Sequence, residues 1–433
     1  MTLRDYLHSL NRENPLIEVN KPISKHLALS GLLKALEPSP VLCNQVIESA
    51  YPVLGNLLCT KEAFAGYLGI SVQKMIPRMI SAIETPTAPQ LAAEAPCQTV
   101  IHEQPDLDDL PILFHCEGDG GNYISSGVMI AGHPRYGQNM DFHRCMQFSK
   151  TEMAVRVVKG RNFDAFLQDL GQVDVAICIG VAPNILVAGA TSVQIGVDEL
   201  GIANALSPFR VVKAQTSDLL IPAEAEFVLE GSVYRDRRHA EGPFVDLTET
   251  RDVIRQEPVL EVKCITHRRD ALWHALLPGG LEHKLLMGMP REPTIFREVN
   301  RAVECLDVHI NPGGSSWLHA IVQIRKHSPD DGIKAIHAAH RGHSSCKHIF
   351  VVDEDIDIYD PLAVEWAMAT RFQADHDLVR LGRERGSSLD PSAESDTYNT
   401  CKVGFDLTAP LGSIRKSFTK VSFPQVDPGQ YLG

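Results

Sequence analysis

The sequence predicts a mixed α/β protein in which a strand-dominated domain lies between two α/β domains. At 433 residues the chain is too long for a single hydrophobic core. Helical and strand-like patterns alternate at both ends, whereas short apolar runs punctuated by Gly and Pro fill the middle. We therefore expect domains at 1–98, 99–292 and 293–433, the second of them a barrel-like sheet.

The first domain reads as an α/β module with a linker behind it. Thr60 can cap a helix that begins at Lys61. The stretch from Thr85 to Pro96 is rich in Pro and Ala, which favours a linker. The expected helices are Leu3–Leu10, Leu27–Leu36 and Lys61–Leu68, and the expected strands are Pro15–Val19 and Val53–Leu58.

In the middle domain, β-branched and apolar runs of strand length recur between turn residues. No sequence repeat is visible, which argues against a propeller or a solenoid. The expected strands are Ile124–Ile130, Ala154–Val158, Val173–Ile179, Phe209–Lys213, Phe227–Val233 and Val259–Ile265.

The last domain returns to an alternation of strands and helices, which indicates a largely parallel sheet. The polar stretch 375–395 is expected to be irregular. Helices are predicted at Thr294–Val303, Asp331–His340 and Pro361–Thr370, and strands at Leu306–Ile310, at Ala320–Ile324 and from His348.

Composition narrows the classes of function. A net charge of −13 argues against nucleic acid or an anionic membrane surface as partner. The chain has no apolar run of bilayer length and no secretory leader, so we expect a cytoplasmic protein. Its ten cysteines lack C-x-x-C spacing, which favours reduced and mostly buried thiols. An anionic ligand must therefore be held by local Arg and Lys side chains.

Chemistry-bearing residues gather in one short stretch. Asn139–Arg144 carries an amide, an acid, a histidine and an arginine within six residues. Two later stretches, Ala240–Asp246 and Leu281–Gly288, look like its partners. In order and spacing these motifs resemble the UbiD family of decarboxylases, and the resemblance covers nearly the whole chain.

The resemblance implies an N-terminal α/β module, a central split β-barrel that binds flavin, and a C-terminal α/β domain. It also implies reversible, non-oxidative decarboxylation with prenylated FMN. Decarboxylation needs a sink for the electron pair that CO2 leaves behind, and no side chain can supply one alone. The sequence carries no Rossmann fingerprint, P-loop or HExxH motif that would indicate another chemistry.

Two residues are the catalytic candidates. The guanidinium of Arg144 offers a planar fork that can hold a substrate carboxylate, and a structural ion pair is its alternative role. Glu282 stands in an apolar stretch, where burial would raise its pKa and make it a proton donor. Its alternative role is a helix-start Glu. Family members usually carry a second acid where Leu281 stands here, and Glu241 is one candidate partner for Arg144.

The resemblance also implies a divalent cation, Mn2+ or Mg2+ with K+ as a further option, against the cofactor phosphate. Its ligands would be Asn139, Asn162 and Glu241. Asn162 stands where the family has a His, which weakens the preference for manganese. Lys402 matches a family Lys that reaches the phosphate, although a solvated surface Lys is the commoner fate. The full set of expected cofactor contacts is Asn139, Met140, Phe142, His143, Arg144, Arg161, Ser192, Glu241 and Lys402.

Two histidines that flank the catalytic candidates, His143 and His283, are expected to line the substrate pocket. They favour a small heteroaromatic acid as substrate. Phenylacrylic, polyprenyl-hydroxybenzoic and small phosphorylated enoic acids are the alternative substrates. A non-catalytic flavin carrier and an FMN reductase are the alternative functions. A flavin prenyltransferase would supply the cofactor, and we expect a homodimer or a homohexamer. A zinc site is not favoured at the remaining histidine-rich segment, His337, His340, His343 and His348.

Overall fold

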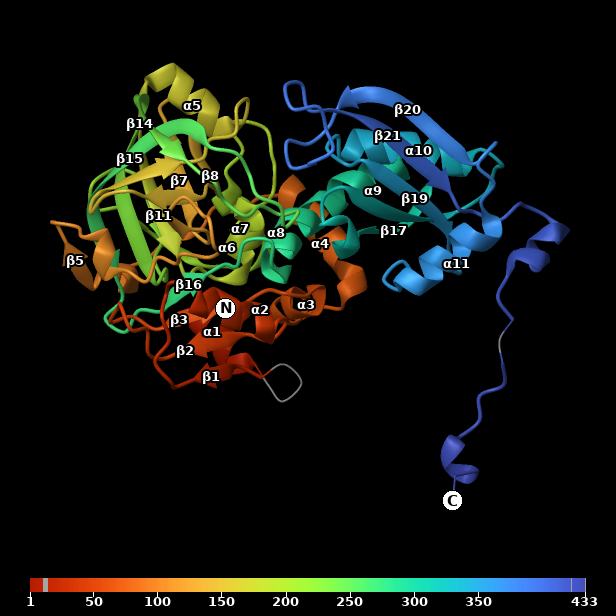
Figure 1. Cartoon of the computed structure of the whole chain (residues 1–433), viewed down its shortest axis with the longest axis horizontal. Helices are drawn as coiled ribbons and strands as arrows, with labels where there is room; N and C mark the ends of the chain where they lie inside the picture. Colours follow the sequence, from red (N-terminus) through yellow and green to blue (C-terminus); the bar gives the residue numbers. More distant parts are fainter. Residues whose placement is uncertain (11–14, 422, 433) are drawn as a thin grey trace. The chain divides into compact units, whose positions relative to one another are not determined.

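The computed structural model describes residues 1–10, 15–421 and 423–432, which form two compact units (Figure 1). The first unit contains Met1–Pro293 together with Ile310–Leu318 and Ser387–Ala393. The second contains Thr294–His309, His319–Gly386 and Glu394–Gly433. The predicted mixed α/β fold with a strand-dominated central domain is confirmed, and the central sheet is antiparallel.

The N-terminal module has a small sheet to which a distant strand is added. Its strands β1 (Ile17–Val19), β2 (Val41–Cys43) and β3 (Val53–Gly55) continue into β16 (Trp273–Ala275). Each of these strands is only three residues long. Because β16 pairs in parallel with β3, the chain just before the Leu281–Gly288 stretch is fixed to the N-terminal module.

Two of the module's helices, α1 and α3, begin at a residue whose side chain caps them. In α3 (Lys61–Leu68) the Thr60 hydroxyl accepts from Ala63 N, as predicted. Thr2 and Asp5 form a capping box at α1 (Leu3–Ser9). α2 covers Ala28–Leu36, and α4 (Met75–Glu84) was not predicted.

The centre of the first unit is one curled antiparallel sheet, seen around β11, β14 and β15 in Figure 1. The long hairpin of β14 (Phe227–Glu241) and β15 (Arg255–His267) shifts register twice, and such irregularities bend a sheet. On the β15 side of the hairpin the sheet continues, moving outward, with β10 (Glu152–Val155), β9 (Cys145–Gln147) and β6 (Asn122–Ile124). On the β14 side it continues with β11 (Gln172–Ile179), β7 (Val128–His133) and β8 (Gly137–Phe142). The short strand β5 (Val100–His102) also pairs with β15.

Three parts of the middle domain differ from the sequence-based expectation. The run Ile124–Ile130 is two strands, because the chain leaves β6 and starts again at β7. The expected linker contributes β4 (Gln90–Leu91), which pairs with β12 (Arg210–Lys213), itself paired with β13 (Leu220–Pro222). The third difference is three helices that were not predicted: α5 (Asn162–Leu170), α6 (Pro183–Gly189) and α7 (Glu199–Leu206).

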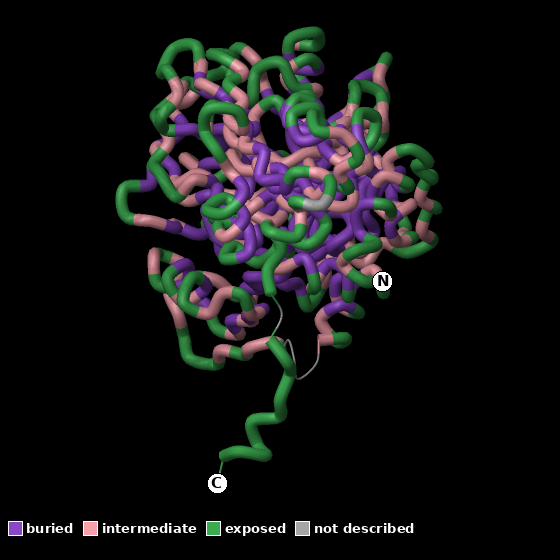
Figure 2. The backbone as a smooth tube through the Cα atoms, turned by 90° about the vertical axis from the view of Figure 1, so that its right-hand side faces the viewer, coloured by how far each residue is buried: buried purple, intermediate pink, exposed green. Residues whose placement is uncertain are grey.

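Most apolar side chains of the first unit lie in two clusters of buried residues. Figure 2 shows the buried positions gathered in the interior and the last stretch of chain exposed. Eight of the ten cysteines are buried, which confirms the expectation for the thiols. Among the described residues no helix has the length and apolar character needed to cross a bilayer.

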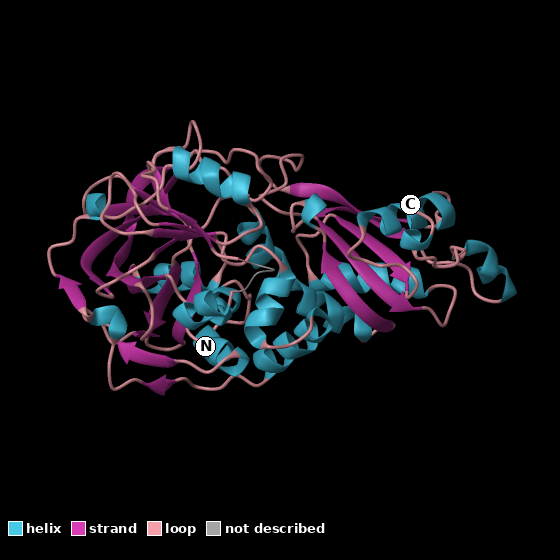
Figure 3. Cartoon of the chain, turned by 90° about the horizontal axis from the view of Figure 1, so that it is seen from below, coloured by secondary structure: helices cyan, strands magenta, loops and turns pink. Residues whose placement is uncertain are grey.

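The second unit holds a five-stranded sheet with helices packed on it (Figure 3). Its order is β17 (Glu304–Ile310), β18 (His319–Arg325), β19 (His348–Asp353), β21 (Asn399–Asp406) and β20 (Leu378–Arg385). The pairs β18–β19 and β19–β21 are parallel, as predicted, and β20 is an antiparallel edge. The expectation of irregular chain over 375–395 is therefore wrong for β20. The predicted helices are α9 (Glu292–Asn300), α10 (Asp331–Gly342) and α11 (Pro361–Arg371).

Candidate functional site

Arg144 follows β8 and lies among three carboxylates. Its Nε donates to Glu241 Oε1 at 2.8 Å and its Nη2 to Glu241 Oε2 at 3.0 Å. Nη1 donates to Asp246 Oδ2 at 3.1 Å, and Nη2 also donates to Asp252 Oδ2 at 2.9 Å. The side chain is 11% exposed. Although burial opposes the charged form, these carboxylates raise the pKa of Arg144, so the guanidinium stays protonated.

Glu241, the last residue of β14, is fixed from two sides. Both of its oxygens accept from Arg144, and Oε1 also accepts from the Tyr123 hydroxyl at 3.1 Å. Gly242 N donates to the same hydroxyl. Gly242 has a φ of +100°, and a Cβ there would lie 2.9 Å from Val253 O, so the turn requires glycine. These contacts make Glu241 a partner of Arg144, and its predicted role as a metal ligand stays a prediction.

The turn continues into a short hairpin that presents the other two acids. Asp246 N donates to Thr250 O, and Asp252 N donates to Phe244 O. Both carboxylates thereby face the same guanidinium. The Phe244 ring covers it, with its centroid 4.8 Å from Arg144 Cζ. Sequence reasoning missed Asp246 and Asp252. The available signal was the position of Asp246 five residues after Glu241 across a Gly-Pro turn.

Glu282 is buried, as expected, and its role as the proton donor stays a prediction. It is the second residue of α8 (Leu281–Gly288) and is 1% exposed. Its carboxylate accepts from Leu57 N at 3.1 Å and Leu58 N at 3.2 Å, and lies 3.1 Å from His274 Nε2. These bonds tie α8 to the chain that follows β3. The geometry gives no support to Glu282 as the proton donor.

His283, the neighbouring residue, does lie at the Arg144 site. Gly279 N donates to His283 Nδ1 at 3.0 Å, which assigns the proton of the neutral ring to Nε2. Burial lowers the pKa of His283, although nearby Asp246 opposes the shift. The ring is therefore a neutral donor close to Asp246, consistent with the predicted substrate contact.

The His143 ring contacts Arg156, Asp141 and Phe163. Its Nδ1 lies 2.9 Å from Arg156 O, and its Nε2 lies 2.9 Å from Asp141 Oδ1, though not aligned as a hydrogen bond. The ring packs on Phe163 of α5. Burial lowers the pKa of His143, but Asp141 more than offsets this and the pKa is raised. Only Nδ1 of His143 is thus hydrogen-bonded, and the predicted substrate contact of this ring stays a prediction.

A second polar site lies at Asn139 in β8. The side chain is buried, and its Nδ2 has no partner among the described residues. The next residue, Met140, donates its N–H to Glu199 Oε2 at 2.9 Å. Glu199 is also buried, which raises its pKa to about 8. Asn162, at the start of α5, donates to Val193 O in the loop that leads to Glu199.

Asn139, Asn162 and Glu199 carry amide and carboxylate oxygens, which are the ligand types that a hard cation prefers. A buried carboxylate beside an amide is stabilised by a divalent ion, which prefers oxygen ligands. Asn139, Asn162 and Glu199 could hold such an ion against an anionic phosphate. The predicted ligand set of Asn139, Asn162 and Glu241 stays a prediction, and Glu199 is a further candidate. Of the four residue types His, Cys, Asp and Glu, the described residues contain no group of three or more arranged for a metal.

The other predicted cofactor contacts are distributed as follows. Met140 is buried, and Phe142 is half-buried against Gly189. Arg161 and Ser192 are exposed. Lys402 belongs to the second unit, where its Nζ donates to Ser344 O at 2.7 Å and lies 3.4 Å from Glu384 Oε2. At 3% exposed it is not a solvated surface lysine.

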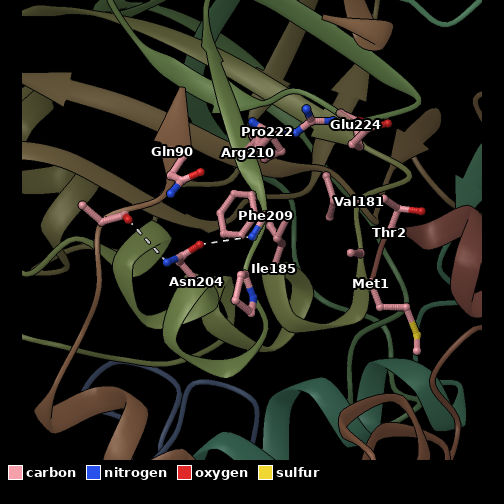
Figure 4. A pocket seen from close by; sticks show the side chains of 14 residues that line it. Met1, Thr2, Gln90, Val181, Ile185, Asn204, Phe209, Arg210, Pro222 and Glu224 are labelled. Carbon is pink, nitrogen blue, oxygen red and sulfur yellow. Dashed lines mark hydrogen bonds and ion pairs between the residues drawn. The ribbon is translucent and has the colours of Figure 1, made fainter. Parts of the chain in front are cut away.

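A cavity of about 440 Å3 in the first unit is separate from these residues. It is lined by side chains from α6, α7, β12 and β13 together with Met1 and Thr2 (Figure 4). Arg210 and Glu224 pair across part of its wall at 3.3 Å. None of the predicted site residues is among its lining residues.

Known proteins match the chain from end to end. Residues 7–83, 90–281 and 284–407 match the N-terminal, Rift-related and C-terminal domains of 3-octaprenyl-4-hydroxybenzoate carboxy-lyase, the UbiD domains. The anhydromevalonate phosphate decarboxylase of Methanothermobacter thermautotrophicus is 39% identical over 97% of this chain and 99% of that protein. The enzyme of that name from Methanocaldococcus jannaschii is 37% identical over 96% and 99%. The UbiD-class enzyme HmfF from Pelotomaculum thermopropionicum, solved with FMN, superposes with a TM-score of 0.96 at 33% identity over all of both chains.

Proposed function

Because the chain belongs to the UbiD family of carboxy-lyases, we propose that it removes CO2 from a small acyclic, α,β-unsaturated acid that carries a phosphate, using prenylated FMN. That it is a UbiD-type decarboxylase follows from the family. The choice of substrate is supported by relatives named for an acyclic phosphorylated acid at 37–39% identity. A small heteroaromatic acid, favoured by the sequence alone, is the second candidate. A flavin carrier and an FMN reductase are not supported, since these relatives are decarboxylases.

The observation that carries the proposal is the buried Arg144 guanidinium held by Glu241 and faced by Asp246. A guanidinium held in a fixed position can orient a substrate carboxylate. After the substrate has bound, Asp246 takes up a proton from solvent through its partly exposed side chain and delivers it to the carbon left by CO2. His283 Nε2–H is the neutral donor beside them.

Prenylated FMN, when bound, supplies the sink for the electron pair that CO2 leaves behind. Asn139, Asn162 and Glu199 would hold its phosphate through a divalent cation. Met140, Phe142, Arg161, Ser192 and Lys402 are the further contacts that we propose. The solved HmfF structure contains FMN, which supports a flavin in this fold.

The proposal is tested on protein co-expressed with a flavin prenyltransferase. We expect mass spectrometry to find a bound flavin heavier than FMN by one prenyl unit. We also expect CO2 release from a phosphorylated enoic acid to exceed release from furan or pyrrole carboxylates. Protein that carries only FMN and releases no CO2 from either class would contradict the proposal. Faster release from the heteroaromatic acids would keep the decarboxylase and reverse the choice of substrate.

The same preparation tests which divalent cation the protein binds and which oligomer it forms. With amide ligands from Asn139 and Asn162, we expect manganese to be lost on dialysis and more than one divalent ion to restore activity. Tightly retained stoichiometric manganese would indicate an additional ligand. Light scattering of the same sample tests the expected homodimer or homohexamer.

A further inference from the structure

Arg144 has almost no donor left for a substrate. A guanidinium carries five N–H groups. Four of them donate to Glu241, Asp246 and Asp252, and both hydrogens of Nη2 are used. A substrate carboxylate held by two parallel bonds needs two of these donors. One of the three acids must therefore leave before Arg144 can bind a substrate in the proposed way.

The charge count leads to the same requirement. Three carboxylates face Arg144, and the only further cation paired with them, among the described residues, is Arg255 on Asp252. The group thus carries a net charge of −1 before any substrate arrives. A like charge entering such a partly buried site is disfavoured unless an acid moves away.

Asp252 is the acid that can move. Glu241 is fully buried and also accepts from Tyr123. Asp246 accepts from Leu247 N, and Arg144 is its only ion-pair partner among the described residues. Asp252 Oδ2 already lies 2.5 Å from Arg255 Nη1, so it keeps a partner when it leaves Arg144. It is 13% exposed, and the two residues after it are 62% and 60% exposed.

We propose that Asp252 occupies, on Nη2 of Arg144, the position of the substrate carboxylate, and that substrate binding moves Asp252 onto Arg255 alone. Asp252 thereby sets the KM of the enzyme. The inference rests on the proposed role of Arg144 in binding the substrate. No covalent step is involved, because the substrate carboxylate replaces the Asp252 carboxylate on Nη2 of Arg144.

Asp252 remains an anion while it competes. Burial opposes its ionisation, but Arg255 and Arg144 lower the pKa of Asp252 below its ordinary value. Protonation near neutral pH therefore does not release it, and the substrate must displace it.

Two substitutions with opposite effects test the inference in the holoenzyme. Asp252→Asn keeps the shape and removes the competing charge, so KM should fall by roughly tenfold with kcat changed less than twofold. Arg255→Gln removes the alternative partner of Asp252, so KM should rise by a similar factor. Asp236→Asn is the control, because Asp236 pairs with Arg235 on the surface of the same unit and is 81% exposed.

A binding measurement separates this inference from the proposed function. The saturated analogue of the acid cannot be decarboxylated, and its Kd by calorimetry should fall in Asp252→Asn by the same factor as KM. An unchanged or raised Kd in Asp252→Asn would overturn the inference. If Asp252→Asn does not fold, Asp252→Ser is measured in its place. Wild-type protein that releases no CO2 would contradict the proposed function, while the calorimetric comparison would still decide the role of Asp252.

Discussion

At the scale of single residues, Asp246 and Glu282 differ in what they contact. Asp246 faces Arg144 and is partly exposed, so a proton can pass between it and solvent. Glu282 accepts from two backbone N–H groups in the interior and lies against His274. These hydrogen bonds connect α8 to the chain that follows β3.

We therefore expect opposite effects from two conservative substitutions. Asp246→Asn should lower kcat by about 10^2- to 10^4-fold, the usual contribution of general acid catalysis, while substrate binding persists. Glu282→Gln should instead lower stability by about 1–3 kcal/mol, because it weakens charged hydrogen bonds in the interior. Deuterium exchange into the product in heavy water isolates the proton transfer, and thermal unfolding reports stability. A slow Glu282→Gln enzyme with normal stability, beside an active Asp246→Asn enzyme, would restore Glu282 as the acid.

Site residues with a known role in a short motif could be predicted, and those whose role depends on the fold alone could not. Arg144 and Glu241 each lie in a short motif, and the structure pairs them. Glu199 reaches Met140 only because α7 packs on β8, which no local pattern reveals. Asp252 reaches Arg144 only through the hairpin between β14 and β15.

At the scale of elements, the turn that carries Glu241 depends on the glycine segment that precedes β6. Gly120 N donates to Pro243 O at 2.7 Å, and a Cβ on Gly120 would overlap the carbonyl oxygen of Gly242. Gly31 in α2 is a matched control, because a Cβ there meets nothing within 4 Å. Two glycines in the same unit thus differ in whether a neighbouring backbone leaves room for a side chain.

Gly120→Ala should displace the turn and with it the acids on Arg144. We expect a loss of about 1–3 kcal/mol in the free energy of unfolding, the usual effect of overpacking, and a fall in kcat/KM. Gly31→Ala should raise stability by about 0.5–1 kcal/mol, because alanine is favoured inside a helix. Thermal unfolding and steady-state kinetics compare the two. A Gly120→Ala enzyme as active and stable as Gly31→Ala would show that the turn adjusts without loss.

Helices and strands marked by a capping residue or an apolar run were predicted from the sequence. α3 begins at its Thr60 cap as expected, and β19 follows the apolar run from His348. α6 is buried at every position, so it has no polar face and no helical period to detect. α4 carries Pro77 in its first turn, where proline is tolerated, although it reads as a helix breaker in sequence. β20 is a polar edge strand, and polarity there resembles a loop.

At the scale of the whole molecule, both units bury histidines in their neutral form. Burial lowers the pKa of His115 in the first unit to about 3. In the second unit it lowers the pKa of His319 and of His340 to about 4. An unfolded chain protonates these rings near pH 6.5. The unfolded state therefore binds more protons between about pH 6.5 and 3, so each ring's contribution to stability is complete above pH 6.5 and is lost as the pH falls through that window.

His115→Gln should make the first unit less sensitive to acid. The amide stays neutral at every pH, whereas the wild-type ring favours unfolding by about 1.4 kcal/mol for each pH unit below 6.5. At pH 5 the variant should thus lose about 2 kcal/mol less than the wild type, relative to pH 7.5. Denaturant unfolding at the two pH values measures this difference in the free energy of unfolding. His8→Gln is the control, because His8 is exposed and belongs to the same unit. It should lose as much free energy of unfolding between the two pH values as the wild type. Equal losses for all three proteins would mean that the His115 ring can be protonated without unfolding, through a local opening that exposes it to solvent.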